Sequence, residues 1–440
     1  MSSKIKNLYL YIFLALFVVA FLFILGWVNY QPWPTFEYFA ASLITADSES
    51  PEIPETSEIP ETFEGLVQEK IEQGKEFLYR MEHSEEHGFY KKYDAVNDSF
   101  EERLYTVYSA SIIYTFLYIY DYDQDEEILK HLSGWGNFLL SMQDKDKNSK
   151  RYGAFSYSYF LNSEEKEKKY VVGTSALSIF TLLRLYKITG QDKYLESAKL
   201  AGDWLITMQR EDGVVKPYTR YSDGRWVFGK KESLLYNGQC LSALSKLYNT
   251  AKIQKYYNAA EKIAKHFTQK YEDAGRKYIV GEYRTKNPIS NSWVVMSLMD
   301  FYPHYPAKRG VRASNYYKDI VFELSSQIIS RQMQDGRIDG AYSTSGNGWI
   351  SEVMTDTYKF CLEQDPSTSS GRDDCEKYKE TVIDIIKWII QRTYSKENSS
   401  FLKNPERALG GVYWNEGNKY VRIDSVCHAI NGYTRIWEGL

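Results

Sequence analysis

Proline is scarce in this chain, and its scarcity narrows the fold class. Only 11 of the 440 residues are proline, whereas 39 are tyrosine and 43% are hydrophobic. Few helix-breaking residues combined with many aromatic ones are typical of long helices rather than of many short strands. We therefore expect an all-α protein with a sizeable hydrophobic core.

The four cysteines lack the spacing of a metal or redox motif. Cys240, Cys361, Cys375 and Cys427 form no CxxC pair, which argues against zinc ribbons and thioredoxin-like proteins. We expect neither a metal site nor a cofactor. Cys240 and Cys427 lie in apolar segments and are expected in the core. Cys361 and Cys375 flank a loop, where a disulfide outside the cytoplasm and two free thiols both fit the sequence.

A concentrated basic face is also absent. The formal net charge is −4, and residues 46–64 alone contain seven acidic residues and no basic one. The chain that follows is therefore nearly neutral and slightly basic. Because a nucleic-acid-binding protein needs clustered positive charge, no nucleic-acid partner is expected.

A hydrophobic run near the N-terminus predicts a membrane anchor. Residues 8–28 carry no charge, and at about 1.5 Å per residue the run can span a bilayer core. Lys4 and Lys6 precede the run, whereas the next basic residue is Lys70. The positive-inside rule then places a tip, residues 1–7, in the cytoplasm and the C-terminal domain outside a cell membrane crossed once. A cleaved signal peptide is the alternative, although its apolar region is usually only about 7–15 residues long.

Residues 29–62 are expected to form an extracytoplasmic linker. The sequence EIPET occurs at 52–56 and again at 58–62. Repeated proline and glutamate with little apolar content cannot bury a core. We predict an extended acidic stalk between the anchor and the rest of the chain.

One pattern recurs six times in the predicted domain at residues 63–440. An amphipathic segment ends in a polar turn, a tyrosine-rich loop follows, and then comes a more apolar segment with small residues. The first segments end at intervals of 59 to 66 residues, at Met81, Met142, Met208, Tyr271, Met333 and Arg392. The second segments are predicted at 102–120, 170–187, 231–249, 289–302, 348–362 and 421–438.

Twelve helices in six hairpins can close into a double ring. Small residues in the second segments allow close helix approach, so these segments are expected to form the inner ring. An open solenoid is the alternative, but the period is too long for a 34-residue helical repeat. The arrangement resembles the (α/α)6 toroids of the six-hairpin glycosidase superfamily. That resemblance implies a carbohydrate-active protein whose site lies where the outer-to-inner loops gather.

A second, local resemblance covers residues 231–302. This stretch resembles the C-terminal domain of D-glucuronyl C5-epimerases, through Gly238 to Ser245, Lys255-Tyr256 with Ala259-Ala260, Gly281-Glu282-Tyr283 and Pro288 to Trp293. It departs from that pattern at three points: Gly281 replaces a glutamate, Arg284 replaces a proline, and Asn291-Ser292 replaces Asn-Gly. The resemblance implies roles for Glu282 and Tyr283 in proton transfer at a uronate.

The loops expected at the site are rich in aromatic and charged residues. Aromatic rings with polar handles suit the faces of sugars, and arginine makes forked bonds to carboxylates. The predicted substrate-binding residues are Arg225, Trp226, Tyr236, Arg284, Tyr342, Trp349, Trp414 and Arg422.

The sixth hairpin contains the tightest cluster of candidate catalytic residues. Asp424 and His428 are four residues apart and share one helix face, and Arg422 directly precedes that helix. The pair could act as an orienting carboxylate with a general base or acid. A helix-capping aspartate and a buried core histidine are the alternative.

Two further carboxylates are expected in the first turns of inner helices. Glu232 and Glu352 could form the acid and base of a glycoside hydrolase, which needs two carboxyl groups about 5–9.5 Å apart. The alternative is that each only stabilises its helix, because the macrodipole favours a carboxylate at that end.

These features predict a membrane-anchored, extracytoplasmic enzyme acting on a polysaccharide or oligosaccharide. A uronate substrate and a C5-epimerase or lyase reaction are favoured by the local resemblance and the arginine- and tyrosine-rich loops. One alternative is a glycoside hydrolase with paired carboxylates. The other is a non-catalytic toroid that binds glycan or protein, which would show no convergent acid, base or arginine.

Overall fold

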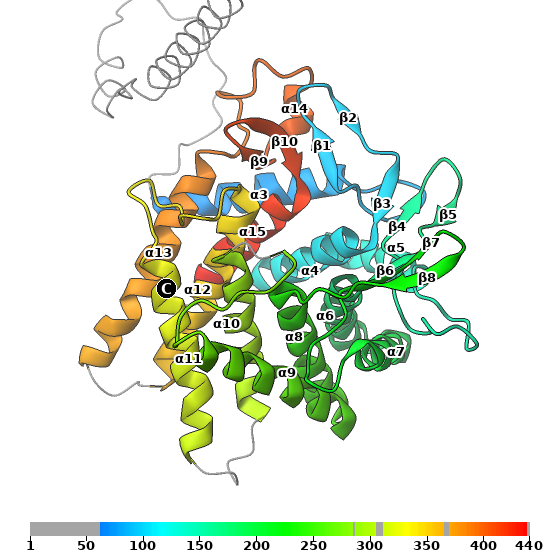
Figure 1. The fold of residues 1–440 in the computed structure, drawn as a ribbon. Helices are drawn as coiled ribbons and strands as arrows, with labels where there is room; N and C mark the ends of the chain where they lie inside the picture. The colour runs from blue at the N-terminus through cyan, green and yellow to red at the C-terminus, as the bar shows by residue number, and fades with distance from the viewer. Residues whose placement is uncertain (1–61, 285–286, 305–310, 365–368, 438–440) are drawn as a thin grey trace, which may run out of the picture. The chain divides into compact units, whose positions relative to one another are not determined.

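The computed structural model describes residues 62–284, 287–304, 311–364 and 369–437 (Figure 1). The predicted tip and anchor, and all of the predicted stalk except Thr62, lie outside the described residues. Within the described ranges, no helix is both long enough and apolar enough to span a membrane.

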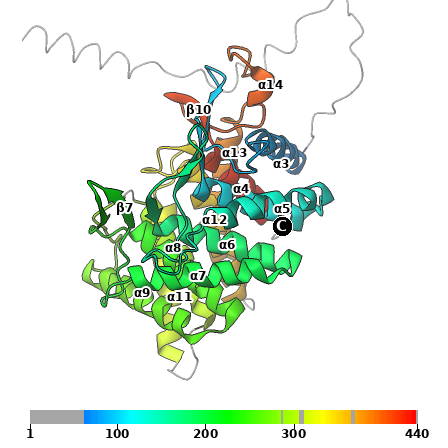
Figure 2. The ribbon, with the colours of Figure 1, turned by 90° about the vertical axis from the view of Figure 1, so that its right-hand side faces the viewer.

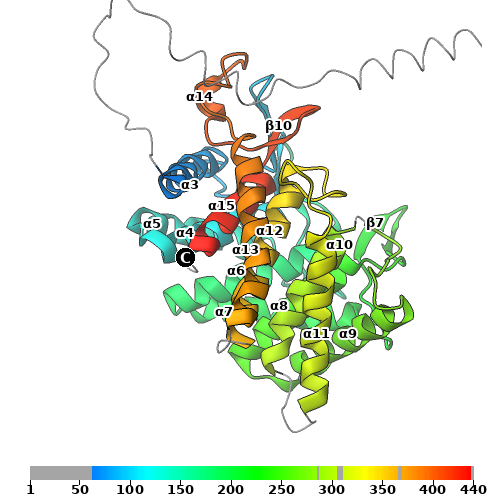
Figure 3. The same cartoon turned by 90° about the vertical axis from the view of Figure 1, so that its left-hand side faces the viewer.

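Six helices form an inner ring. Each contacts the next one along the chain, and the last contacts the first, so the ring is closed. Figure 3 shows several of them behind the outer helices. They are α4 (Thr106–Asp123), α6 (Val172–Thr189), α8 (Leu234–Ala251), α10 (Ile289–Phe301), α12 (Thr344–Gln364) and α15 (Ile423–Trp437). Several are buried on nearly all sides, as in α10, which fits their continuous apolar and small-residue composition.

The other long helices pack around this ring, and each leads through a loop to its inner partner (Figure 2). They are amphipathic: in α9, for example, the buried residues recur at helical spacing on one side. The six outer helices are α3 (Phe63–Arg80), α5 (Glu126–Ser141), α7 (Asp192–Met208), α9 (Gln254–Asp273), α11 (Val311–Ile329) and α13 (Ser369–Ile390). In the described ranges the remaining helical elements are a short helix, α14 (Pro405–Ala408), and a 3-10 turn, η1 (Tyr302–His304).

The predicted double ring of six hairpins is confirmed. Every predicted inner helix overlaps an observed one, with ends within four residues of the prediction. The close approach expected of the small residues is seen at Gly238, where an added Cβ would lie 2.7 Å from the backbone oxygen of Trp293.

The prediction of an all-α protein is incomplete. The outer-to-inner loops contain short antiparallel strands in three sheets, ordered β2-β1-β10-β9, β3-β4-β5 and β6-β7-β8. Tyrosine-rich loops of this length satisfy their backbone groups by pairing with one another. The strands are β1 (Lys92–Asp94), β2 (Ser99–Phe100), β3 (Arg103–Tyr105), β4 (Ser158–Phe160), β5 (Glu165–Lys166), β6 (Lys169–Val171), β7 (Tyr218–Ser222), β8 (Arg225–Phe228), β9 (Tyr413–Asn415) and β10 (Asn418–Arg422).

A glutamine and a glycine anchor the turns that follow two of the outer helices. Gln209 donates to the backbone oxygens of Gly213 and Ala259, and Gln332 donates to those of Gly336 and Thr381. Gly213 and Gly336 have positive φ, and an added Cβ would lie 2.4 Å from a backbone oxygen of the next outer helix. Only glycine fits such a position. These contacts tie one hairpin to the next and fix the direction of each loop.

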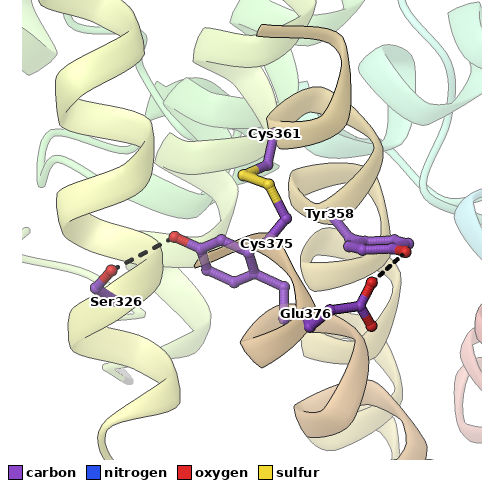
Figure 4. Close-up of a disulfide and its surroundings, with 6 residues drawn as sticks. Ser326, Tyr358, Cys361, Cys375 and Glu376 are labelled. Carbon is purple, nitrogen blue, oxygen red and sulfur yellow. Dashed lines mark hydrogen bonds between the residues drawn. A yellow bond between two sulfur atoms is a disulfide. The ribbon is translucent and has the colours of Figure 1, made fainter. Parts of the chain in front are cut away.

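A disulfide links α12 to α13. Cys361 and Cys375 are bonded, with Cα atoms 5.8 Å apart, so the structure favours the disulfide over two free thiols. Figure 4 shows Tyr358 beside it, donating to Glu376 at 3.0 Å. The bond closes the hairpin across the loop between the two helices.

Removing this disulfide should destabilise the domain. A loop of this length gives about 3 kcal/mol in the chain-entropy account, which for a domain of this size corresponds to a melting temperature lower by roughly 4 °C. The double variant Cys361→Ser/Cys375→Ser should show that loss in a thermal melt followed by circular dichroism. A reducing agent should lower the melting temperature of the unmodified protein but not of the variant, and equal stability of the two proteins would contradict the prediction.

Candidate active site

The inner ring encloses a cavity of about 530 Å³. Two neighbouring helices contribute parallel rows of side chains to it. The row on α12 is Ser345, Trp349, Glu352 and Asp356, and the row on α15 is Asp424, His428, Asn431 and Arg435. Each row follows one helix face over eleven residues, so the lined depth is about 16 Å at 1.5 Å rise per residue.

The centre of the cavity holds a carboxylate–imidazole pair. Oε1 of Glu352 lies 2.5 Å from Nδ1 of His428, and the Glu352 side chain is only 3% exposed. Asn431 donates to its other oxygen at 3.3 Å. A carboxylate acceptor at Nδ1 fixes the imidazole tautomer, which makes Nε2 the nitrogen able to take or give a proton.

An ion pair lies one helical turn closer to the mouth. Nε of Arg422 donates to Oδ1 of Asp424 at 2.6 Å, its Nη2 donates to Oδ2, and Ser345 also donates to Oδ2 at 2.9 Å. Burial alone would raise the pKa of Asp424, but Arg422, the nearby His428 and Ser345 together lower it. Asp424 is therefore a carboxylate at neutral pH. The guanidinium of Arg422 lies 3.8 Å from the centre of the Trp414 ring, at the cavity wall.

The inner end of the cavity contains two more ion pairs. Arg435 donates to Asp356 at 2.8 Å and to Tyr118 at 2.8 Å, and Lys246 donates to Asp300 at 2.5 Å. Burial raises the pKa of Asp356, and the attraction of Arg435 does not fully offset that effect. Asp424 near the mouth and Asp356 at the inner end thus have pKa values shifted in opposite directions.

Aromatic rings form much of the wall. The rings of Trp293 and Trp349 are stacked, with centroids 3.9 Å apart, and Tyr108, Tyr157 and Tyr236 also line the cavity. Burial raises the pKa of Tyr108, so its hydroxyl keeps its proton at neutral pH. Such walls can contact both the C–H faces and the hydroxyl groups of a sugar.

Arg284 differs from the other cations of the cavity. Lys246, Arg422 and Arg435 each pair with a carboxylate. Arg284 instead lies near the rings of Tyr236 and Tyr283, at 5.5 and 5.7 Å. Among the described residues, it has no carboxylate partner. As far as the described part of the chain shows, the guanidinium of Arg284 is thus free to pair with an anionic group of a ligand.

Eight of the predicted site residues line the cavity. These are Asp424, His428, Glu352, Tyr236, Arg284, Trp349, Trp414 and Arg422. Six others are not among its lining residues, namely Glu232, Glu282, Tyr283, Arg225, Trp226 and Tyr342.

The Glu232 carboxylate is bound on the outer side of the ring. It lies 2.6 Å from Nε2 of His266 and 2.5 Å from Nζ of Lys270, both on α9, and Asn237 donates to it at 3.2 Å. Burial would raise the pKa of Glu232, but the bonds to His266 and Lys270 lower it. The group is 8% exposed and holds α8 against α9.

The other five residues lie in the segments that connect outer helices to inner ones. Glu282 accepts a bond from the backbone nitrogen of Glu232, which fixes the loop that carries Tyr283. Tyr342 is 67% exposed. Arg225 and Trp226 belong to β8, in the hairpin outside the cavity.

Sequence reasoning missed several polar groups of the inner end. Tyr114, Tyr118, Lys246, Asp300, Asp356, Asn431 and Arg435 all line the cavity from within helices rather than from loops. The sequence did contain a signal for these groups, because polar residues recur at helical spacing on the same helix faces as Glu352 and His428. Among the described residues, no group of three histidine, cysteine or acidic side chains is placed to hold a metal ion.

The closed double ring has the fold of an (α/α)6 toroid, and comparisons with known proteins find solved structures of the same fold. Glycosyl hydrolase family 76 matches residues 161–298, less than half of the chain. No curated protein matches the chain in sequence.

Solved structures with this fold include enzymes of several activities. Cellobiose 2-epimerase from Bacillus thermoamylovorans is 12% identical and has a TM-score of 0.63 over 84% of this chain and 98% of that chain. An unsaturated glucuronyl hydrolase from Streptococcus agalactiae is 14% identical, with a TM-score of 0.58 over 86% and 94%. A family 76 α-1,6-mannanase from a Salegentibacter species is 13% identical, with a TM-score of 0.57 over 84% and 99%. The solved structures show a shared fold, and the family 76 match is consistent with the prediction of an enzyme acting on carbohydrates.

Proposed function

We propose that this protein is a carbohydrate-active enzyme whose catalytic centre is the Glu352–His428 pair. One observation carries the proposal: a buried carboxylate orients an imidazole inside an aromatic cavity. Catalytic bases are commonly built in this way. The convergence of a base, carboxylates and arginines argues against a toroid that only binds its ligand.

The reaction that best fits the cavity is proton abstraction at C5 of a uronate. Nε2 of His428 takes the C5 proton while Glu352 stabilises the imidazolium that forms. The electron pair left on C5 spreads into the sugar carboxylate, which Arg284 neutralises. A proton returned to the opposite face, from a tyrosine such as Tyr108, gives the epimer. Loss of the O4 substituent instead gives a 4,5-unsaturated sugar, which is the lyase reaction.

Glycoside hydrolysis is the second candidate. The match to family 76 and the opposite pKa shifts of Asp356 and Asp424 favour it. One observation weighs against a family 76 mechanism. The Salegentibacter mannanase has an inactive variant in which two adjacent aspartates are replaced. The only Asp-Asp pair in this sequence is Asp373-Asp374. It belongs to the outer helix α13, and Asp374, whose side chain the structure describes, is not among the residues that line the cavity.

We further propose that the enzyme works outside the cytoplasm, anchored in the membrane by residues 8–28. The charge-free run and its flanking lysines support the anchor. The disulfide between Cys361 and Cys375 supports an oxidising compartment, because such bonds are rare in reducing cytoplasm.

Proton NMR in heavy water tests the reaction directly. The full-length protein in detergent micelles is incubated with neutral and uronate-containing polysaccharides and oligosaccharides. If the protein is an epimerase, we expect the uronate H5 signal to disappear as deuterium replaces the proton, and no new chain ends to form. Vinyl proton signals would instead identify a lyase, and new reducing-end anomeric signals a hydrolase. Unchanged spectra across the whole panel would contradict catalysis and favour the binding toroid.

A further inference from the structure

The sheet β6-β7-β8 borders the cavity, because Val171, at the end of β6, is one of the cavity-lining residues. Strand β6 leads directly into α6, and the β7–β8 hairpin precedes α8. The sheet therefore rests on the N-terminal ends of two adjacent inner helices. Lys169, in β6, places its ammonium 4.1 Å from the centre of the Tyr157 ring, which lines the cavity. The surface of this sheet is thus continuous with the cavity wall.

One face of this sheet carries a row of cations. Lys169 lies directly opposite Arg220, and Ser222 lies directly opposite Arg225. Directly opposed residues of antiparallel strands share a face, and side chains alternate along each strand. Lys169, Arg220 and Arg225 therefore all lie on one face, spaced by about 5–8 Å. Arg220 and Arg225 are exposed.

These cations are not neutralised by the protein. Among the described residues, none of the three has a carboxylate ion-pair partner. The stretch 216–231 contains five basic residues and one acidic residue. Like charges placed directly opposite each other, such as Lys169 and Arg220, destabilise a sheet. An anionic ligand lying between them would remove that repulsion.

The hairpin is also held rigidly enough to act as a binding platform. Its two-residue turn, Asp223-Gly224, has positive φ at both positions, which matches the twist of a tight hairpin. On the opposite face Trp226 packs near Tyr170, with centroids 5.7 Å apart, and Arg151 lies 4.0 Å from the Trp226 ring. The aromatic face anchors the hairpin and leaves the basic face directed away from that contact.

We propose that Lys169, Arg220 and Arg225 form an outer subsite that binds an anionic polysaccharide whose reacting residue lies in the cavity. This inference rests on the proposed function, because it extends the same site to a longer, acidic substrate. The occupant is a polymer with regularly spaced carboxylates rather than a neutral glycan. Arg284 in the cavity and the basic face outside it then contact successive anionic groups of one chain.

Binding measurements on long and short ligands test the subsite. The full-length protein in detergent is titrated calorimetrically with polygalacturonate, with alginate, with their trimers and with methyl-esterified polygalacturonate, which has the same backbone without charge. We expect the variant Arg220→Gln/Arg225→Gln to bind at least one anionic polymer about tenfold more weakly, and its trimer equally well. The matched control Lys262→Gln/Lys265→Gln removes the same charge from α9 and should bind like the unmodified protein.

Each result decides the inference separately from the proposed function. Weaker binding of an anionic polymer only in the hairpin variant supports the subsite, even if no turnover is seen. The inference is overturned if the hairpin variant and the unmodified protein bind the polymers with equal affinity. It is also overturned if the hairpin variant loses as much affinity for the trimers as for the polymers. The inference is also overturned if the unmodified protein binds no anionic polymer, or if it binds the esterified polymer as tightly as the charged one. Neither result would contradict the proposed function in its second form, the hydrolysis of a neutral glycan.

Discussion

Replacing Glu352 by glutamine should lower kcat by at least about 100-fold, because proton transfer by a positioned base typically contributes 10²–10⁴-fold and His428 would lose the carboxylate that positions it. A glutamine amide can donate as well as accept, so it no longer holds His428 in the tautomer with a proton on Nδ1. KM should change little, since Glu352 acts on the imidazole rather than on the sugar. The measurement is steady-state kinetics with the substrate found by NMR.

Two further variants separate catalysis from stability. His428→Gln should lower kcat to a similar extent. The double variant Glu352→Gln/His428→Gln should have a kcat no lower than that of either single variant, because the two residues act as a unit. Glu261→Gln is the matched control, since Glu261 pairs with Lys265 on the outer surface of α9. Circular dichroism checks that each variant is folded. Additive losses in the double variant, or a kcat unchanged by either single change, would contradict the assigned roles.

The helices could be predicted because their periodicity is a local property of the sequence. Outer helices alternate apolar and polar faces, and inner helices are apolar with small residues, so both kinds can be recognised before any tertiary contact is known. The short strands could not be predicted in this way. Strand β10, for instance, pairs with β1, more than 300 residues earlier in the chain, and no local pattern encodes that partner.

The candidate site shows where helix boundaries limit sequence reasoning. Glu232 and Glu352 were both predicted in the first turn of an inner helix. In the structure α12 begins at Thr344, so Glu352 lies two turns inside the helix and on its cavity face. Helix α8 begins at Leu234, so Glu232 precedes it and turns towards α9 instead. A difference of a few residues in where a helix starts therefore decides whether its carboxylate lies in the cavity or on the outer side of the ring.

Glu232 should accordingly prove important for stability and not for turnover. Replacing it by glutamine leaves Lys270, whose side chain is 26% exposed, without its buried carboxylate partner. Because the carboxylate of this pair is buried but the ammonium is partly exposed, its loss should cost about 3 kcal/mol, at the lower end for buried pairs. That cost lowers the melting temperature by roughly 4 °C for a domain of this size. At a temperature where both proteins are folded, kcat should be unchanged.

The dependence of this effect on pH gives a second test. Because the folded protein lowers the pKa of Glu232, the stabilisation is fully present above the unfolded pKa of about 4.3 and is lost as the pH falls through the lower folded value. Part of the difference in melting temperature between the unmodified protein and Glu232→Gln comes from the ionisation of Glu232. That part should be constant above roughly pH 5.5 and should shrink below about pH 4. A variant that is stable but loses kcat would instead assign Glu232 to catalysis, as the sequence first suggested, and would require the loop around Glu282 to move towards the cavity.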